Sequence, residues 1–209
     1  SRVLGDVYTL QISVCDWQSG LLTLLYDVVG EGTAEMSVMP VGKALNLLVP
    51  LGNGFDVSRG GERPLLIGGG IGIAPLYWLA KELIKSGSRP VIVMGFNSAA
   101  DVSWVNEFRA LTDEVVVATA LGDYGIKGFV TDTEPVRNAV EYSYYYSCGP
   151  MPMLRALGKQ VQIGGELSLD ERMACGFGIC MCCSLATKDG TKRICKDGPV
   201  FTTDELIWK

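Results

Sequence analysis

Five of the chain's seven cysteines lie in one stretch, ACGFGICMCCSLATKDGTKRIC, at residues 174–195. Four of them have the spacing C-x4-C-x2-C with a fourth cysteine after eleven further residues: Cys175, Cys180, Cys183 and Cys195. This spacing is typical of plant-type [2Fe–2S] sites, whereas structural zinc sites usually pair two C-x2-C units. The pattern therefore predicts a [2Fe–2S] cluster. We expect Gly176 and Gly178 to allow the backbone angles and the close approach that such a loop needs.

Other cysteine chemistry remains open at this point: a zinc site, a reactive thiol or a disulfide. The chain has no histidine, which excludes mixed Cys/His zinc sites, a Rieske-type cluster and histidine as a general base. Under reducing conditions, crowded cysteines are more often ligands than disulfides. Cys182 does not fit the ligand spacing, and we expect it to be a small buried side chain.

A glycine-rich loop follows an apolar run at residues 65–72, LLIGGGIG. Pro75 suits the first turn of a following helix, and Gly87 suits the position just past its end. A strand that ends in glycines at a helix N-terminus can bind phosphate, because free N–H groups and the helix dipole point at the anion. A tight turn without a ligand would explain the same residues.

Apolar runs continue to alternate with amphipathic stretches along the chain. Strands are predicted over 90–96, 114–120 and 142–150, and helices over 101–111, over 134–140 and from Met151. This alternation predicts a parallel sheet covered on both faces, with ligands at the carboxyl ends of its strands. Cys148 lies at such a strand end, as a core thiol or as part of a site.

The charge and the apolar runs of the chain indicate which classes of partner it can bind. The net charge is −5 and the pI is about 4.8, which argues against a nucleic-acid-binding surface. The longest uncharged run, Pro64–Ala80, is short for a membrane span and contains glycines and a proline. No basic segment followed by an apolar core opens the sequence. We therefore expect a cytoplasmic protein that binds neither nucleic acid nor a membrane.

The N-terminal part has a different pattern. A β-rich run over 20–29 is followed by a short predicted helix, GEGTAEM, and by a predicted strand over 43–55, KALNLLVPLGNGF. Gly30, Gly32 and Thr33 mark the start of the helix, where a second phosphate could bind. A hairpin turn with Thr33 as the helix N-cap is the simpler interpretation.

Seven motifs in this order resemble the electron-transfer subunits of NAD-dependent (class B) dihydroorotate dehydrogenases, within the ferredoxin–NADP reductase superfamily. They are GEGT, PLGNGF, GGGIGIAPL, YGIKG, CGPMPML, DERMACGFGICMCC and KRICKDGPVF. The resemblance runs from about Ile12 to the C-terminus. The glycine loops are common to the superfamily, whereas the cysteine motif joined to CKDGPVF is much more specific.

The resemblance implies an α/β fold with a β-barrel, in three parts. These are a flavin-binding β-barrel domain over 1–60, a parallel-sheet NAD-binding domain over 61–164, and a [2Fe–2S] lobe over 165–209. It also implies a partner, an FMN-containing catalytic subunit that oxidises dihydroorotate in pyrimidine biosynthesis, in a heterotetramer. Electrons would pass from that FMN through the cluster and FAD to NAD, since a flavin must join one-electron to hydride transfer.

The family's cofactor contacts can be transferred to this sequence. By resemblance, the flavin contacts are Ile12, Ser13, Leu25, Tyr26, Asp27, Gly32 and Thr33. The nicotinamide contacts are Gly70, Gly72, Pro75, Cys148, Gly149 and Pro150. None of these residues would perform acid–base catalysis. NAD is expected rather than NADP, because the run GFNSAAD at the end of the second predicted strand offers no arginine for a 2′-phosphate.

The N-terminal part departs from the family pattern. Leu10 and Gln11 stand where the family has Arg-Pro, and Asp27 stands where a basic residue is common. The segment before PLGNGF is about half of what a closed six-stranded barrel needs at ordinary strand lengths. We therefore expect an incomplete barrel. Either the TLQIS stretch joins segments that are not contiguous in the parent polypeptide, or the chain is a deletion form with a compromised FAD site.

Two other functions fit parts of the pattern. One is the small subunit of another NAD(P)H:ferredoxin-type oxidoreductase or of a sulfide dehydrogenase. The other is a zinc-stabilised, non-enzymatic nucleotide-binding protein. A relay subunit would also need a docking surface near the cluster, and we expect that surface around Met173, Phe177 and Met181, unless these side chains simply pack around the cluster.

Overall fold

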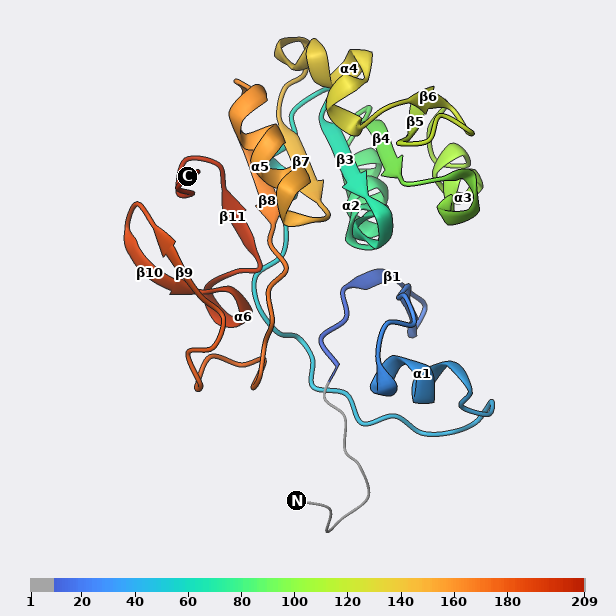
Figure 1. Ribbon diagram of the computed structural model, residues 1–209, viewed down its shortest axis with the longest axis vertical. Helices are drawn as coiled ribbons and strands as arrows, with labels where there is room; N and C mark the ends of the chain where they lie inside the picture. Colours follow the sequence, from blue (N-terminus) through green and yellow to red (C-terminus); the bar gives the residue numbers. More distant parts are fainter. Residues whose placement is uncertain (1–9, 209) are drawn as a thin grey trace.

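A computed structural model describes residues 10–208 of the chain. In Figure 1 a layered sheet with its helices forms the upper half, and the N-terminal segment lies below it. The strands are β1 (Val14–Gln18), β2 (Leu21–Leu24), β3 (Leu65–Gly69), β4 (Val91–Phe96), β5 (Val115–Thr119), β6 (Ile126–Lys127), β7 (Tyr145–Cys148), β8 (Gly165–Ser168), β9 (Ser184–Thr187), β10 (Gly190–Arg193) and β11 (Val200–Thr202). The helices are α1 (Glu31–Ser37), α2 (Ile73–Lys85), α3 (Val105–Arg109), α4 (Glu134–Arg137), α5 (Met151–Gln160) and α6 (Ile194–Asp197).

The main sheet has seven strands in the order β11-β8-β7-β3-β4-β5-β6. Neighbouring strands from β8 to β6 pair in parallel, and β11 joins the β8 edge antiparallel. The predicted parallel sheet is therefore confirmed. The helix predicted over 101–111 is shorter, since α3 covers only Val105–Arg109. Among residues 10–208, no helix has both the length and the apolar character needed to cross a membrane.

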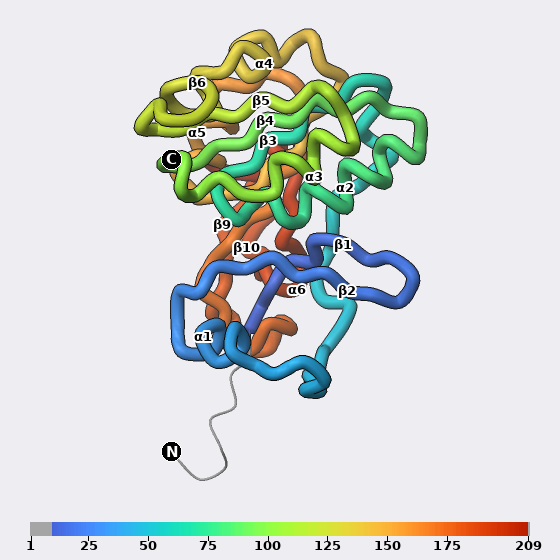
Figure 2. Tube along the Cα trace, turned by 90° about the vertical axis from the view of Figure 1, so that its right-hand side faces the viewer, coloured from blue at the N-terminus to red at the C-terminus, as the bar shows by residue number. Residues whose placement is uncertain are grey.

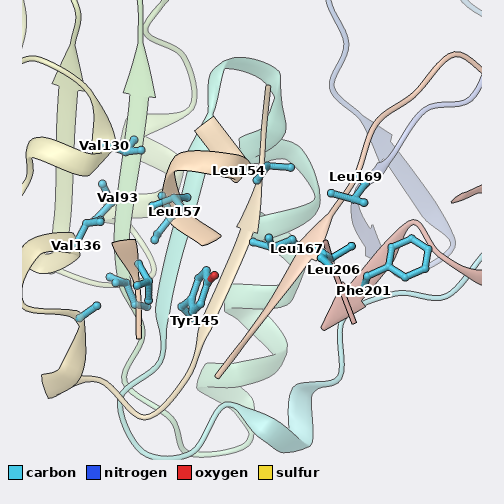
Figure 3. Packing of buried hydrophobic residues seen from close by; sticks show 14 of the residues in the cluster. Val93, Val130, Val136, Tyr145, Leu154, Leu157, Leu167, Leu169, Phe201 and Leu206 are labelled. Atoms are coloured by element: carbon cyan, nitrogen blue, oxygen red, sulfur yellow. The ribbon is translucent and has the colours of Figure 1, made fainter. Parts of the chain in front are cut away.

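Both faces of the sheet are buried, as the continuous apolar runs of its strands require. Side chains alternate along β3, so Leu65 and Ile67 face one core and Leu66 faces the other. Leu154 of α5 belongs to the first core, which Figure 3 shows from close by. Leu76 of α2 belongs to the second. The two helices therefore cover opposite faces and hold the strand ends in place.

The order of the strands creates a switch point beside β3. The chain runs from β3 outward to β4 and β5, and then returns to β7 on the other side of β3. The connections that follow the neighbouring strands β3 and β7 therefore lead in opposite directions, to β4 and to β8. In open α/β sheets, ligands bind outside the carboxyl ends of the strands at such a point.

The N-terminal segment does not form a barrel in the part of the chain that is described. From residue 10 to residue 60 its regular structure is the two-stranded β1–β2 sheet, α1 and one 3-10 turn, Val57–Arg59. The strand predicted over 43–55 is wrong, because this stretch has only an isolated bridge from Asn53 to Pro199. A strand needs a neighbour to pair its N–H and C=O groups. Leu48 and Val49 accordingly remain exposed.

The β1–β2 hairpin is attached to the sheet domain through α2. Cys15 of β1 is fully buried, and burial raises the pKa of its thiol to about 11. The neighbouring Asp16 carboxylate accepts hydrogen bonds from Lys81 Nζ at 2.6 and 2.8 Å. In Figure 2 the hairpin lies directly below the helices of the sheet domain. The β1–β2 hairpin is thus placed against α2 by one buried side chain and one ion pair.

Candidate functional site

The first three predicted cluster ligands lie on an irregular loop between β8 and β9. Gly176 and Gly178 have φ angles of +75° and +88°, a region that strongly favours glycine. The backbone requirement expected at these two positions is therefore confirmed. Met181 also has a positive φ, of 61°, which is uncommon for a residue with a side chain and is typical of constrained functional loops.

Backbone N–H groups of this loop point at cysteine sulfurs. Cys175 Sγ accepts from the N–H of Ile179 at 3.3 Å and from that of Cys180 at 3.5 Å. The N–H groups of Cys180 and then Phe177 are the main causes that lower the pKa of Cys175 to about 6. Donors aimed at a sulfur stabilise the thiolate, which is the form that binds metal.

The same kind of hydrogen bond recurs at two more ligand positions. The N–H of Cys182 donates to Cys180 Sγ at 3.4 Å, and the N–H of Cys195 donates to Cys183 Sγ at 3.4 Å. Cys182 itself is exposed, so the expected buried side chain is wrong. Its own sulfur lies 3.6 Å from the carbonyl oxygen of Arg172.

A β-hairpin explains the long gap before the fourth cysteine. Strands β9 and β10 pair antiparallel, and the N–H of Ile194 donates to the carbonyl of Cys183 at 3.0 Å. Cys183 and Cys195 are thereby brought together, and both are buried. The sequence analysis missed this hairpin. A signal was present in Asp189-Gly190, since Asp-Gly between two short β-prone runs favours a hairpin. In the structure Lys188 and Asp189 form the turn, and Gly190, with a φ of +111°, begins β10.

Arg193 joins the two halves of the cysteine site. Its guanidinium donates to the carbonyl oxygen of Gly178 at 2.6 Å and lies 3.5 Å from the Asp197 carboxylate. The Asp197 carboxylate in turn accepts from the N–H of Arg193 at 2.7 Å. The loop with the first three cysteines is therefore fixed to the segment with the fourth. No pattern in the sequence marks an arginine in this role.

The residues fit an iron–sulfur cluster by the chemistry of their donors. All seven cysteines are free thiols. Cys175 and Cys180 lie on one loop, and Cys183 and Cys195 flank the β9–β10 hairpin. Thiolates with backbone N–H groups directed at their sulfurs are the ligand set that such clusters use. Within residues 10–208, no three Cys, Asp or Glu side chains are close enough together to hold a single metal ion.

The predicted nicotinamide residues meet at the switch point. A Cβ atom added at Gly72 would lie 2.6 Å from the carbonyl carbon of Cys148 and 2.7 Å from Gly149 Cα. The loops that follow β3 and β7 are therefore in direct backbone contact. Pro75 lies in the first turn of α2, as predicted. The structure thus brings Gly72 and the 148–150 corner together at the carboxyl edge of the sheet.

Cys148 is a neutral thiol at this edge. Burial raises its pKa to about 12, only partly offset by a hydrogen bond with Ser168. A thiol with this pKa is neither a nucleophile nor a general base at neutral pH.

Part of the predicted flavin set also comes together. Ile12 and Ser13 directly precede β1, and Leu25–Asp27 directly follow β2. Because Val14 pairs with Leu24, these two groups lie at the same end of the hairpin. Thr33 is in the first turn of α1 and is not its N-cap. Its hydroxyl accepts from the N–H groups of residues 29 and 30, at 3.1 and 3.2 Å.

Known proteins are similar to this chain over nearly all of its length. Residues 170–207 match the iron–sulfur cluster binding domain of dihydroorotate dehydrogenase B. The dihydroorotate dehydrogenase B (NAD(+)) electron transfer subunit of Fusobacterium nucleatum is 42% identical over 204 residues, covering 94% of this chain and 78% of the relative. The chain belongs to this family. The corresponding subunit of Shouchella clausii is 40% identical over 205 residues, covering 95% of this chain and 78% of that subunit.

Membership of the dihydroorotate dehydrogenase B electron-transfer subunits confirms the resemblance seen in the motifs. The chain is thus an electron-transfer subunit of an NAD-dependent oxidoreductase, with an iron–sulfur domain near its C-terminus. A solved structure of an NADH-dependent reduced ferredoxin-NADP oxidoreductase has a TM-score of 0.82 and 30% identity, covering 94% of this chain and 73% of that one. This second similarity supports a ferredoxin reductase-like fold. The iron–sulfur domain match favours iron over zinc at the cysteines.

Proposed function

We propose that Cys175, Cys180, Cys183 and Cys195 hold a [2Fe–2S] cluster through which electrons pass from an FMN-containing catalytic subunit to FAD and NAD. The observation that carries this proposal is the set of backbone N–H groups aimed at the sulfurs of Cys175, Cys180 and Cys183.

The bound groups and the chain have separate tasks. When bound, the cluster transfers single electrons, and the flavin couples two of them to hydride exchange with NAD. The chain holds the thiolates by N–H donors, and Arg193 fixes the cysteine loop to the hairpin that carries the fourth ligand. Residues 165–209 would therefore act as the cluster-binding lobe, which contributes β8 and β11 to the main sheet of residues 61–164 and carries the four cysteines between these two strands.

The nicotinamide nucleotide would bind at the switch point. Gly70 and Gly72 lie between β3 and α2, and Pro75 lies in the first turn of α2, where helix N–H groups can meet a diphosphate. The Cys148–Pro150 corner would lie beside the nicotinamide, with Cys148 as an uncharged contact. After β4, Ala99 N–H donates to the Asp123 carboxylate at 2.9 Å. An acidic group at this loop disfavours the 2′-phosphate of NADP, which supports NAD as the acceptor.

The flavin would contact the end of the β1–β2 hairpin and the start of α1. Its residues would be Ile12, Ser13, Leu25, Tyr26 and Asp27, with Gly32 and Thr33. The described strands in residues 10–60 are β1 and β2 alone. We therefore expect FAD to dissociate more readily than the cluster, since two strands enclose it less completely than a closed barrel would.

The proposed relay can be tested by composition. Protein purified without oxygen should contain about two irons and two acid-labile sulfides per chain, with FAD and with a visible spectrum that bleaches on reduction. Iron, sulfide, zinc and flavin assays on one sample decide the matter. Zinc in place of iron, or no metal, would contradict the cluster assignment, and iron without flavin would contradict only the FAD site.

The partner subunit would dock on an apolar surface made by the cysteine loop. Phe177, Ile179 and Met181 are 49%, 76% and 52% exposed, although they stand between cluster ligands. Met173 instead packs against the sheet core, so for this residue the packing interpretation is favoured. Exposed apolar side chains grouped in this way are typical of protein interfaces.

Charged residues on this surface should weaken the complex. Phe177→Glu combined with Met181→Glu is expected to raise the dissociation constant for the catalytic subunit by about 30-fold or more, because buried apolar anchors dominate such interfaces. Titration of the partner by calorimetry, with iron content as a check on cluster retention, measures this. Val140→Glu is the matched control, since Val140 is also exposed and lies in the 3-10 turn Ala139–Glu141. Unchanged affinity in the double variant would show that the partner docks on another surface.

A further inference from the structure

Asn53 connects the N-terminal segment to the part of the chain that follows Cys195. Its side-chain amide donates two hydrogen bonds, to the carbonyl oxygens of Lys196 and Asp197, both at 3.1 Å. Its backbone N–H donates to the carbonyl of Gly198 at 2.7 Å. One residue thus binds three consecutive carbonyl groups that lie more than 140 positions away in the sequence.

These carbonyl groups belong to the turn that carries the fourth cysteine. Cys195 is the second residue of the single-turn helix α6, Ile194–Asp197. The last carbonyls of a helix have no partner inside it and must be satisfied from outside. Asn53 supplies donors to these groups in α6. The backbone position of Cys195 therefore depends on a side chain from another part of the chain.

The other end of the Asn53 segment is fixed on the parallel sheet. The N–H of Asp56 donates to the Glu166 carboxylate of β8 at 2.9 Å, and Tyr146 Oη of β7 donates to the Asp56 carbonyl at 2.7 Å. Around Asn53 the two backbones are also in close contact, because a Cβ at Gly52 would lie 2.6 Å from the Gly198 oxygen. Asn53 is therefore held on a rigid support, and its amide can act as a fixed donor.

We infer that Asn53 is a positioning residue for the cluster ligand Cys195, and that it sets the geometry and lability of the cluster from the connection between the N-terminal segment and the sheet. The inference rests on the proposed role of Cys195 as a ligand. The hydrogen bonds hold α6 against the 52–56 connection. Cys195 in turn donates its N–H to Cys183 Sγ, so a shift of α6 changes the surroundings of two ligands.

The role can be tested with isosteric and truncating variants of the holoprotein. Asn53→Asp replaces the NH2 group that makes both hydrogen bonds by a carboxylate oxygen that faces carbonyl oxygens, whereas Asn53→Ala only removes the donor group. Asn53 is exposed, so neither change disrupts a core. Release of iron to a chelator is expected to be about threefold faster in Asn53→Ala and about tenfold faster in Asn53→Asp. The g-values of the reduced cluster should also shift.

Asn106→Asp is the matched control, because Asn106 is exposed on α3 and lies outside the cysteine lobe. Cys195→Ala tests the ligand role of Cys195 separately from the positioning role of Asn53. Loss of iron in Cys195→Ala, with wild-type release rates and g-values in both Asn53 variants, would overturn the positioning role and leave the ligand assignment intact. Retention of a normal cluster in Cys195→Ala would overturn the ligand assignment itself.

Discussion

Cys183→Ala is expected to abolish the cluster, whereas Cys182→Ala should retain it. The two cysteines are adjacent in the sequence but differ in burial and in the hydrogen bonds of their sulfurs. Cys183 is buried and its sulfur accepts the N–H of Cys195, while Cys182 is exposed and its sulfur lies 3.6 Å from the Arg172 carbonyl. Only the first has the environment of a metal-bound thiolate.

The effect should be close to all-or-none. Iron should fall from about two per chain to well below one in Cys183→Ala, because a [2Fe–2S] core needs four ligands. Electron transfer from the catalytic subunit to NAD should fall with it. Iron analysis, the visible spectrum and NAD reduction by the reconstituted complex measure this, and circular dichroism checks that the α/β sheet is intact. A cluster lost in Cys182→Ala and kept in Cys183→Ala would refute the assignment.

The features that the sequence predicted correctly depend on local rules. The glycines with positive φ and the loop between β3 and α2 are each fixed by a few neighbouring residues. The parallel sheet follows from apolar runs that are long enough to be buried on both faces. The family resemblance added FAD and NAD as cofactors, which the spacing of the glycines alone could not identify.

The features that were missed depend on contacts between distant parts of the chain. The run over 43–55 has strand-like residues but no strand beside it, so its pattern could not show that pairing is absent. Asn53 and Arg193 donate hydrogen bonds to backbone carbonyl groups. Every residue has a backbone carbonyl, so the sequence does not mark which ones will be the partners. Cys182 is exposed, and its backbone N–H points at the sulfur of Cys180. This arrangement depends on the path of the whole loop, which the residue type does not show.

Gly72→Ala is expected to damage the nicotinamide site and the sheet together. The new Cβ would lie 2.6 Å from the Cys148 carbonyl carbon and 2.7 Å from Gly149 Cα, which are distances that Cβ atoms essentially never show. Both neighbours are backbone atoms at the end of a central strand, so they cannot turn away as a flexible side chain could. The strain should cost about 3 kcal/mol, which lowers the melting temperature by roughly 6–12 °C.

Binding of NADH should weaken more than the loss of stability alone explains, because the same two loops would hold the nucleotide. The dissociation constant measured well below the melting temperature is expected to rise about tenfold or more, which corresponds to about 1.4 kcal/mol. Gly54→Ala is the matched control, since no heavy atom lies within 4 Å of its added Cβ. Gly54→Ala should therefore melt and bind like the wild type. Normal NADH binding in a destabilised Gly72→Ala would show that the β3 and β7 loops support the fold but do not contact the nucleotide.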